Sequence, residues 1–386
     1  MGAERRPRLN PRTEIAVWAA AAGRCTFCNR LVTENDELGI IVPIGELAHN
    51  VGWSKGSPRG NSPKSVADRS RADNLLLLCR NCHKPADDNG VIGCYSVEVL
   101  QRFKQEHEAR IRFLTEIGAD RKALVIRLVG PVRGVSPELT YDTVLAATTA
   151  VGVFPATLPN AYRNAIEIDL REYSEGTPEA FEACIAKIND YVARINEGIK
   201  RDKISRLAVF AFARIPLLVH LGAQLDDKVP MLIFQRQRVN DENAWRWPLN
   251  PPEPPLFRCD KLQDGDSSRV ALVLNISGTI HLRELPRDVQ ETYTVYDLAP
   301  IPPTESGPSV ISSPAAWASF ERTVRGFLAH VEKEHGKIPE IAIFPAVPIS
   351  CAITLGRALM PHVSPSLVLF DRNEQNEFFR ALEVRR

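Results

Sequence analysis

Four of the eight cysteines fall in two C-x-x-C pairs, Cys25/Cys28 and Cys79/Cys82. Each pair places two thiols on one tight turn, and two such turns supply the sulfurs of a tetrahedral zinc site. The spacing therefore predicts one structural Zn²⁺, with a long segment inserted between the pairs. The remaining cysteines are scattered and are expected to be ordinary buried residues: Cys94, Cys184, Cys259 and Cys351.

Polar residues with catalytic potential accompany these pairs. His49 lies in GELAHN, Asn74 opens NLLLLC, and His83 follows Cys82 directly. Taken in order, the segments CTFC, LAHN, NLLLLC and CRNCH resemble the HNH endonucleases that carry an embedded zinc site, over roughly residues 20–110. The resemblance implies an α+β ββα-metal fold built around the zinc.

The same resemblance implies a role for each polar residue. Phosphodiester hydrolysis needs a base that deprotonates water and a cation that neutralises charge on the phosphate. His49 would be the general base, the amide oxygen of Asn74 would orient its ring, and His83 would bind a divalent ion such as Mg²⁺, Mn²⁺ or Ni²⁺.

One position departs from the family pattern. Many members carry an aspartate before the base histidine, and that aspartate binds the ion, whereas this chain has Ala48. Asp87 is the first choice to replace it, because residues four apart on a helix share a face and Asp87 lies four after His83. Glu46 and Asp88 are the alternatives.

Charge and hydropathy restrict the partners and the location. Between Lys55 and Lys84 lie seven basic residues and only two acidic ones, which indicates either a polyanionic partner or a solvated loop. The apolar run at 207–225 is interrupted by Arg214, Pro216 and His220, so a strand followed by a helix is expected rather than a membrane span. The start, MGAERRPRLNPR, has no apolar signal region, so a cytoplasmic location is expected.

The elements that must position these residues follow from apolar periodicity. In the N-terminal part we expect a helix from residue 13 to Gly23, loops over much of 31–78, a strand at 74–79, and helices starting near Cys82 and at 97–117. Farther on, strands are expected at 123–129, 164–170, 206–212, 230–235, 269–277, 340–346 and 366–370. Helices are expected at 178–197, 216–225, 315–335 and 350–360. Apolar strands between helices predict a largely parallel α/β sheet.

A chain of 386 residues exceeds one ordinary core. We expect a basic tail at 1–12, a nuclease domain at 13–118 and an α/β region at 122–386. NPPEPP divides this region into halves of about 122–249 and 256–386. The segments RLAVFAFARIPLLVHLGAQL and EIAIFPAVPISCAITLGRAL are alike, which favours two related Rossmann-like units.

This α/β region resembles the SAVED domain, a fusion of two CARF-like units, through FARIPLLVHLG (212–222), FQRQRVNDENAWRW (234–247) and IFPAVPISCAITLGRALMP (343–361). With the HNH segment in front, the chain resembles the HNH–SAVED effector nucleases of bacterial CBASS anti-phage systems. That resemblance implies activation by a cyclic dinucleotide ahead of a trinucleotide, assembly of a dimer into a tetramer, and degradation of double-stranded DNA with little sequence preference.

Ligands of open α/β sheets bind beyond the carboxyl ends of the strands. Arg214, the backbone of Ser277 and Gly278, and the turn from Pro345 to Ser350 are therefore expected to meet phosphates. Trp245 and Trp247 could stack on a base or pack in the core. The sequence has no GxGxxG motif and no P-loop, which disfavours NAD and ATP.

Two other functions compete with the nuclease. A zinc-knuckle protein could bind nucleic acid without catalysis, although it would need none of His49, Asn74 and His83. A small-molecule α/β enzyme with a zinc appendage would need an acid–base cluster in 122–386, and the sequence offers none.

Overall fold

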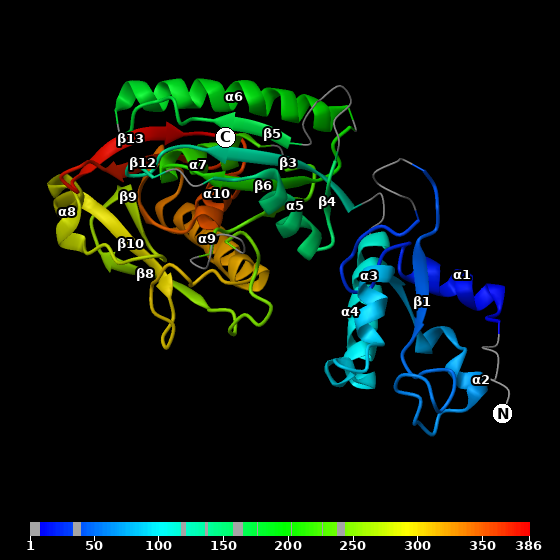
Figure 1. Cartoon of the computed structure of the whole chain (residues 1–386). Helices are drawn as coiled ribbons and strands as arrows, with labels where there is room; N and C mark the ends of the chain where they lie inside the picture. The colour runs from blue at the N-terminus through cyan, green and yellow to red at the C-terminus, as the bar shows by residue number, and fades with distance from the viewer. Residues whose placement is uncertain are drawn as a thin grey trace, which may run out of the picture. The chain divides into compact units, whose positions relative to one another are not determined.

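The computed structural model describes residues 8–33, 40–116, 121–135, 138–156, 165–175, 177–201, 203–225, 227–237 and 244–386. The chain forms two compact units, Met1–Gly118 and Ala119–Arg386, each with its own core (Figure 1). Residues 1–7 of the expected basic tail and 238–243 of the FQRQRVNDENAWRW segment lie outside the described residues. Among the described helices, none has both the length and the apolar character needed to cross a membrane.

The first unit is built on two antiparallel strands and the helix that follows them. Its elements are α1 (Pro11–Ala20), β1 (Gly45–His49), α2 (Val66–Arg69), the 3-10 helix η1 (Ala72–Asn74), β2 (Leu75–Cys79), α3 (Arg80–Ala86), the 3-10 helix η2 (Ile92–Cys94) and α4 (Val97–Thr115). β2, with the sequence LLLLC, is buried at every position and forms the centre of this core. The predictions of β2, α3 and α4 are confirmed, and β1 lies within the stretch that was expected to be mostly loops.

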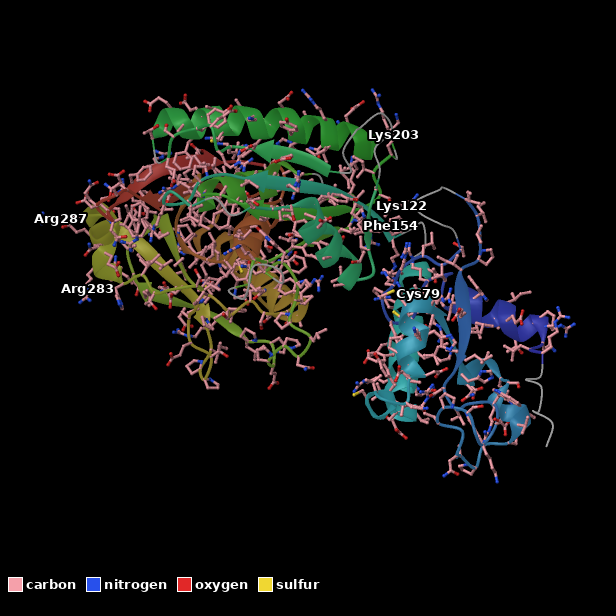
Figure 2. The ribbon with its side chains drawn as sticks, viewed as in Figure 1. Cys79, Lys122, Phe154, Lys203, Arg283 and Arg287 are labelled. Carbon is pink, nitrogen blue, oxygen red and sulfur yellow. The ribbon has the colours of Figure 1, made fainter. Side chains whose placement is uncertain are left out.

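The second unit begins with a parallel sheet in the order β4-β3-β6-β7, with β5 also beside β3. Its elements are β3 (Lys122–Val129), α5 (Tyr141–Ala150), β4 (Phe154–Pro155), β5 (Ala165–Asp169), α6 (Pro178–Lys200), β6 (Leu207–Phe212), α7 (Ile215–Gln224) and β7 (Met231–Ile233). α6 begins at its N-cap, Thr177, whose hydroxyl accepts from the N–H of Ala180. At the sheet edge, the ammonium of Lys122 lies over the ring of Phe154, 5.8 Å from its centroid (Figure 2).

A second sheet follows in the order β13-β12-β11-β9-β10-β8. Its elements are β8 (Phe257–Gln263), β9 (Asp266–Asn275), the 3-10 helix η5 (Leu282–Glu284), α8 (Arg287–Thr292), β10 (Tyr293–Pro300), α9 (Pro314–His335), β11 (Glu340–Ala346), α10 (Ile349–Arg357), β12 (Ser366–Arg372) and β13 (Phe378–Val384). The inner strands are parallel, whereas β8 and β13 run antiparallel at the two edges. All strands and helices predicted for 122–386 are confirmed, while α5, α8, β4, β8, β10 and β13 are additional.

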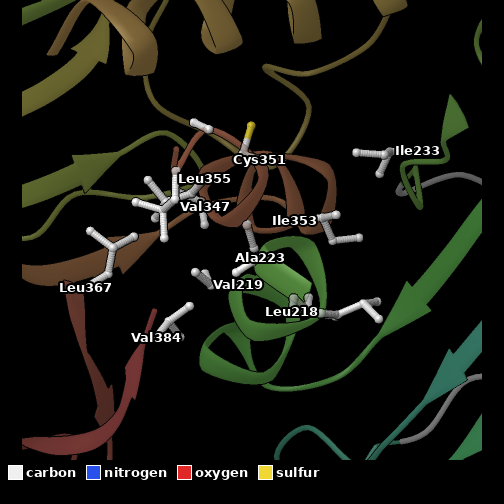
Figure 3. Packing of buried hydrophobic residues seen from close by; sticks show 14 of the residues in the cluster. Leu218, Val219, Ala223, Ile233, Val347, Cys351, Ile353, Leu355, Leu367 and Val384 are labelled. Atoms are coloured by element: carbon white, nitrogen blue, oxygen red, sulfur yellow. The ribbon is translucent and has the colours of Figure 1, made fainter. Parts of the chain in front are cut away.

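The two similar sequence segments form equivalent elements that pack against each other. One is β6 followed by α7, and the other is β11 followed by α10. A Cβ on Gly222 would lie 2.0 Å from the carbonyl oxygen of Ile353, and one on Gly356 would lie 2.0 Å from that of Val219. The helices therefore cross backbone to backbone at their Leu-Gly steps, in the main core of the unit (Figure 3).

Candidate metal centre and ligand edge

Four cysteines converge in the first unit. Cys25 and Cys28 lie on the turn after α1, Cys79 ends β2 and Cys82 lies in α3 (Figure 2 labels Cys79). Their sulfurs all lie within 4.8 Å of one another, and those of Cys28 and Cys79 are 3.8 Å apart. Thiolates at a Zn–S distance of about 2.3 Å stand about 3.8 Å apart around a tetrahedral ion. The cluster predicted from the spacing can therefore hold a metal ion such as zinc.

Ionisation of the thiols in this cluster needs a compensating positive charge. Burial, together with the neighbouring sulfurs, raises the pKa of Cys82 well above its ordinary value. Thiols this close cannot all ionise unless a nearby positive charge compensates them. Four sulfur donors supplied by the protein leave no position for a substrate, which is the donor set of a structural zinc.

His83 lies between two carboxylates. Its Nδ1 is 2.6 Å from Oε2 of Glu46 on β1, and its Nε2 is 3.2 Å from Oδ2 of Asp87, the residue after α3. The hydrogen bond with Asp87 raises the pKa of His83, although burial opposes this. The structure thus brings His83 together with two of the carboxylates considered as ion ligands. Asp88 instead accepts a hydrogen bond from the N–H of Gly90, at 2.7 Å.

Arg59 is a residue of this site that sequence reasoning missed. Its side chain is only 6% exposed, and it donates to Oδ1 of Asp87 at 2.6 Å. It also donates to the carbonyl oxygens of Ala86 (2.6 Å), Asn50 (2.7 Å) and His49 (3.2 Å). Burial alone would raise the pKa of Asp87, but hydrogen bonds from the neighbouring imidazole and from Arg59 outweigh it and lower that pKa. Arg59 therefore links the end of β1 to the end of α3.

The basic stretch between Lys55 and Lys84 presents less charge to solvent than its residue count suggests. Arg69 also turns inward, and it donates to the carbonyl oxygens of Lys64 (2.9 Å), Gly52 (2.8 Å) and Ser62 (2.8 Å). An irregular loop has no ladder to satisfy its carbonyls, so buried arginines supply the donors. Two of the seven basic residues, Arg59 and Arg69, thus hold the loop together, and nothing in the local sequence separates them from the others.

His49 and Asn74 lie close together, because His49 ends β1 and pairs with Leu75, the residue that directly follows Asn74. His49 is the last residue of β1 and is buried. The side chain of Asn74 accepts from the N–H of Val51 at 3.1 Å and donates to the carbonyls of Val51 and Arg69, both at 2.9 Å. These bonds fix the chain just after His49. The role expected for this amide oxygen at the imidazole of His49 stays a prediction.

At the carboxyl edge of β6, Arg214 is committed to protein partners. Its Nε donates to Asp371 at 2.7 Å, one terminal nitrogen is 3.1 Å from Glu175, and the other donates to the carbonyl of Arg372 at 2.7 Å. These partners come from both halves of the second unit. These contacts favour a structural ion-pair network over the phosphate contact expected from the sequence. The sequence did not reveal these partners, because Asp371 lies 157 residues farther along the chain than Arg214.

The two tryptophans belong to the packing of the unit. Trp245 is 2% exposed and meets Phe210 edge-on, with centroids 5.6 Å apart, which favours packing in the core, one of the two roles expected for it. Trp247 is partly buried against the main core.

The other edge residues differ in how much they leave for a ligand. The N–H of Ser277 donates to the carbonyl of Ala346 at 2.8 Å. Ser350 is fully buried, and both its N–H and its hydroxyl donate to Oε1 of Gln235, at 3.0 and 2.9 Å, so the start of α10 is occupied by a residue that follows β7. Pro345 is half-buried in β11, and Gly278 has open space where a Cβ would stand. A ligand could therefore approach Gly278 without displacing a neighbouring side chain.

Comparisons with known proteins bear on the second unit. A family model described as SAVED, the SMODS-associated and fused to various effectors sensor domain, matches residues 188–384. No curated protein matches the chain.

Solved structures of Cap4, a SAVED/CARF-domain containing receptor from Acinetobacter baumannii, are similar over 75% of this chain. The complex with the cyclic trinucleotide 3'3'3'-cAAA has 12% identity, a TM-score of 0.46 and 62% of its own chain covered. The complex with 2'3'3'-cAAA has 13%, 0.47 and 61%, and a structure of the receptor described without a ligand has 13%, 0.42 and 60%. This chain thus spans less than two thirds of the Cap4 chains.

The family match begins within α6 and includes α7, α10 and the whole second sheet. It covers just over half of the 386 residues. The chain therefore belongs to the SAVED family of sensor domains.

Proposed function

We propose that this protein is a metal-dependent HNH endonuclease, activated by a cyclic oligonucleotide, that degrades double-stranded DNA in anti-phage defence in the cytoplasm. The nuclease domain is residues 13–118 and the sensor is residues 122–386. One observation carries the proposal: α3 follows the antiparallel pair β1–β2 directly and sets His83 2.6 Å from Glu46, next to the sulfur cluster. A sensor family described as fused to various effectors supports an effector role for the first unit.

The polar residues and the cysteines of the first unit have complementary roles in phosphodiester hydrolysis. His49 removes a proton from the attacking water. Asn74 fixes the chain that follows this base. His83 and a carboxylate hold a divalent ion such as Mg²⁺, which when bound neutralises charge on the phosphate. The four cysteines hold a zinc that contributes folding free energy.

The SAVED region supplies control. A nuclease with little sequence preference would damage its host if it were always active. A ligand shifts an equilibrium only by binding one state more tightly, so the activator must prefer the active assembly. We expect a dimer to become a tetramer, with a cyclic dinucleotide ahead of a trinucleotide. Two of the Cap4 structures contain cyclic trinucleotides, and these belong in any ligand panel.

The test combines plasmid DNA, full-length protein, Mg²⁺ and a panel of cyclic di- and trinucleotides. The expected result is intact plasmid without ligand, degraded plasmid with one ligand, and a doubling of mass by light scattering. Full cleavage without ligand would remove the gating. DNA binding without cleavage under every condition would instead support the non-catalytic zinc-knuckle protein.

A further inference from the structure

We infer that the catalytic ion is bound by Glu46 and by Nδ1 of His83, while Asp87 orients the imidazole and Arg59 orients Asp87. The inference rests on the proposed nuclease function. It differs from the first choice made from the sequence, in which Asp87 binds the ion. The two carboxylates, Glu46 and Asp87, differ in their hydrogen-bond partners and in their exposure to solvent.

Glu46 reaches His83 from β1. Side chains alternate along a strand, so Glu46 shares its face with Ala48 and not with the neighbouring candidate base. Ala48 has no ligand atom, whereas Oε2 of Glu46 lies 2.6 Å from Nδ1 of His83. The side chain of Glu46 is also 45% exposed, which leaves room for an ion and its waters. Glu46, two residues earlier on the same face of β1, can therefore supply the carboxylate that position 48 lacks.

Asp87 is engaged through both oxygens. Oδ1 accepts from Arg59 at 2.6 Å, and Oδ2 lies 3.2 Å from Nε2 of His83. A guanidinium at this distance forms a charge-assisted hydrogen bond that competes with a cation for the carboxylate. Metal-binding histidines usually donate the other ring N–H to a carboxylate, which fixes the tautomer. Asp87 lies where such a partner belongs, so we place the ion on the side of Nδ1, where it would be held between this nitrogen and Oε2 of Glu46.

The backbone of the loop over residues 50–60 places the Arg59 side chain between the ends of β1 and α3. Arg59 has a φ of 55°, a left-handed conformation that costs free energy in a residue with a side chain. The turn also depends on Gly60, where a Cβ would lie 1.9 Å from the carbonyl oxygen of Ser54. A strained, buried arginine persists only where its surroundings determine it. Here the acceptors at the ends of β1 and α3 do so.

Mn²⁺ binding to the full-length, zinc-loaded protein, followed by electron paramagnetic resonance of the free ion, measures this site without DNA cleavage. Glu46→Gln removes a charged ligand and should weaken Mn²⁺ binding more than about tenfold. Asp87→Asn keeps an oxygen that accepts from Nε2–H, so its loss should stay below about tenfold, while Asp87→Ala frees the ring and should lose about 10–100-fold. Asp88→Asn is the matched control and should bind like the wild type.

Arg59 is tested against Arg69, the other buried arginine of the loop. Arg59→Lys should weaken Mn²⁺ binding because Asp87 loses its fixed partner. Arg69→Lys should leave Mn²⁺ binding unchanged, since the guanidinium of Arg69 donates its hydrogen bonds to the loop carbonyls of Lys64, Gly52 and Ser62 among the described residues. Equal losses in both variants, with circular dichroism unchanged, would reduce Arg59 to a loop-packing residue and overturn its assignment.

The order of Mn²⁺ affinities among the variants decides which residues bind the ion. Wild-type affinity in Glu46→Gln, a larger loss in Asp87→Asn than in Glu46→Gln, or no Mn²⁺ site in the wild type would each overturn it. Plasmid cleavage, measured in parallel with the activating cyclic nucleotide, separates this inference from the function. DNA cleavage together with a different order of Mn²⁺ affinities would support the nuclease and overturn the assignment of the ion ligands. The expected order of Mn²⁺ affinities without any DNA cleavage would support the ion site and contradict the nuclease function.

Discussion

Nε of Arg214 donates a hydrogen bond to Oδ2 of Asp371 at 2.7 Å and so joins the start of α7 to the end of β12. Glu175 lies on the same guanidinium at 3.1 Å and itself accepts from the backbone N–H groups of Arg133 and Gly134, both at 2.7 Å. The network connects the carboxyl edges of the two sheets. It therefore holds the two sheets of the second unit in one arrangement.

Arg214→Ala should destabilise the second unit. The change leaves two partly buried carboxylates without their cation, and breaking such a pair costs about 3 kcal/mol. Urea unfolding of the variant and the wild type measures this loss. Unchanged stability together with lost cyclic-nucleotide binding would make Arg214 a phosphate contact, as its position after β6 first suggested.

Gly356→Ala should separate α7 from α10. The added Cβ would lie 2.0 Å from the carbonyl oxygen of Val219, and overpacking of this kind costs about 1–3 kcal/mol or more. Gly326→Ala, within α9, is the matched control, because nothing lies within 4 Å of its added Cβ. That control should be neutral or stabilising by about 0.5–1 kcal/mol. Similar thermal midpoints for both variants would show that the crossing is not tight.

Cys82→Ser should unfold the first unit and release its metal. A structural zinc contributes folding free energy directly, so the loss of one thiolate removes much of that contribution. Metal analysis should find about one zinc per wild-type chain. Cys94→Ser, at an exposed cysteine outside the cluster, should retain the zinc and the fold. A folded wild-type protein without zinc would remove the site.

Stability of the second unit should fall as the pH is lowered from about 6.5 to about 4. Burial lowers the pKa of His220 to about 4, and its Nε2 lies 2.8 Å from Oδ1 of Asn189. In the unfolded chain the same group titrates near 6.5, so between these values the unfolded state binds more protons. The loss is about 2 kcal/mol by pH 5. His220→Gln should remove this part of the slope, and parallel stability curves for the two proteins would contradict the assignment.

Sequence patterns predicted the elements and sites that depend on neighbouring residues. The run at 207–225 is one strand and one helix because each buries a continuous apolar segment, and β6 and α7 confirm this. The sulfur cluster was predictable because both members of a C-x-x-C pair lie on one turn.

Residue roles that depend on distant partners were not predictable. The contacts of Arg214 span 157 positions to Asp371, and those of Arg59 span 28 positions to Asp87. Both residues look like solvated or ligand-binding cations until the fold brings a carboxylate to them. The edge strand β13 has the same problem, since its sequence, FFRALEV, does not alternate strictly between polar and apolar residues and its pairing with β12 contains an irregularity of register.

The role proposed for the first unit is DNA cleavage with His49 as the base. The most direct measurement compares initial rates of plasmid cleavage by the wild type and His49→Ala, with Mg²⁺ and the activating cyclic nucleotide, in preparations shown to keep zinc and ligand binding. We expect His49→Ala to lose about 10²–10⁴-fold in rate, because removal of a general base costs that much. A variant that cleaves at close to the wild-type rate would contradict it.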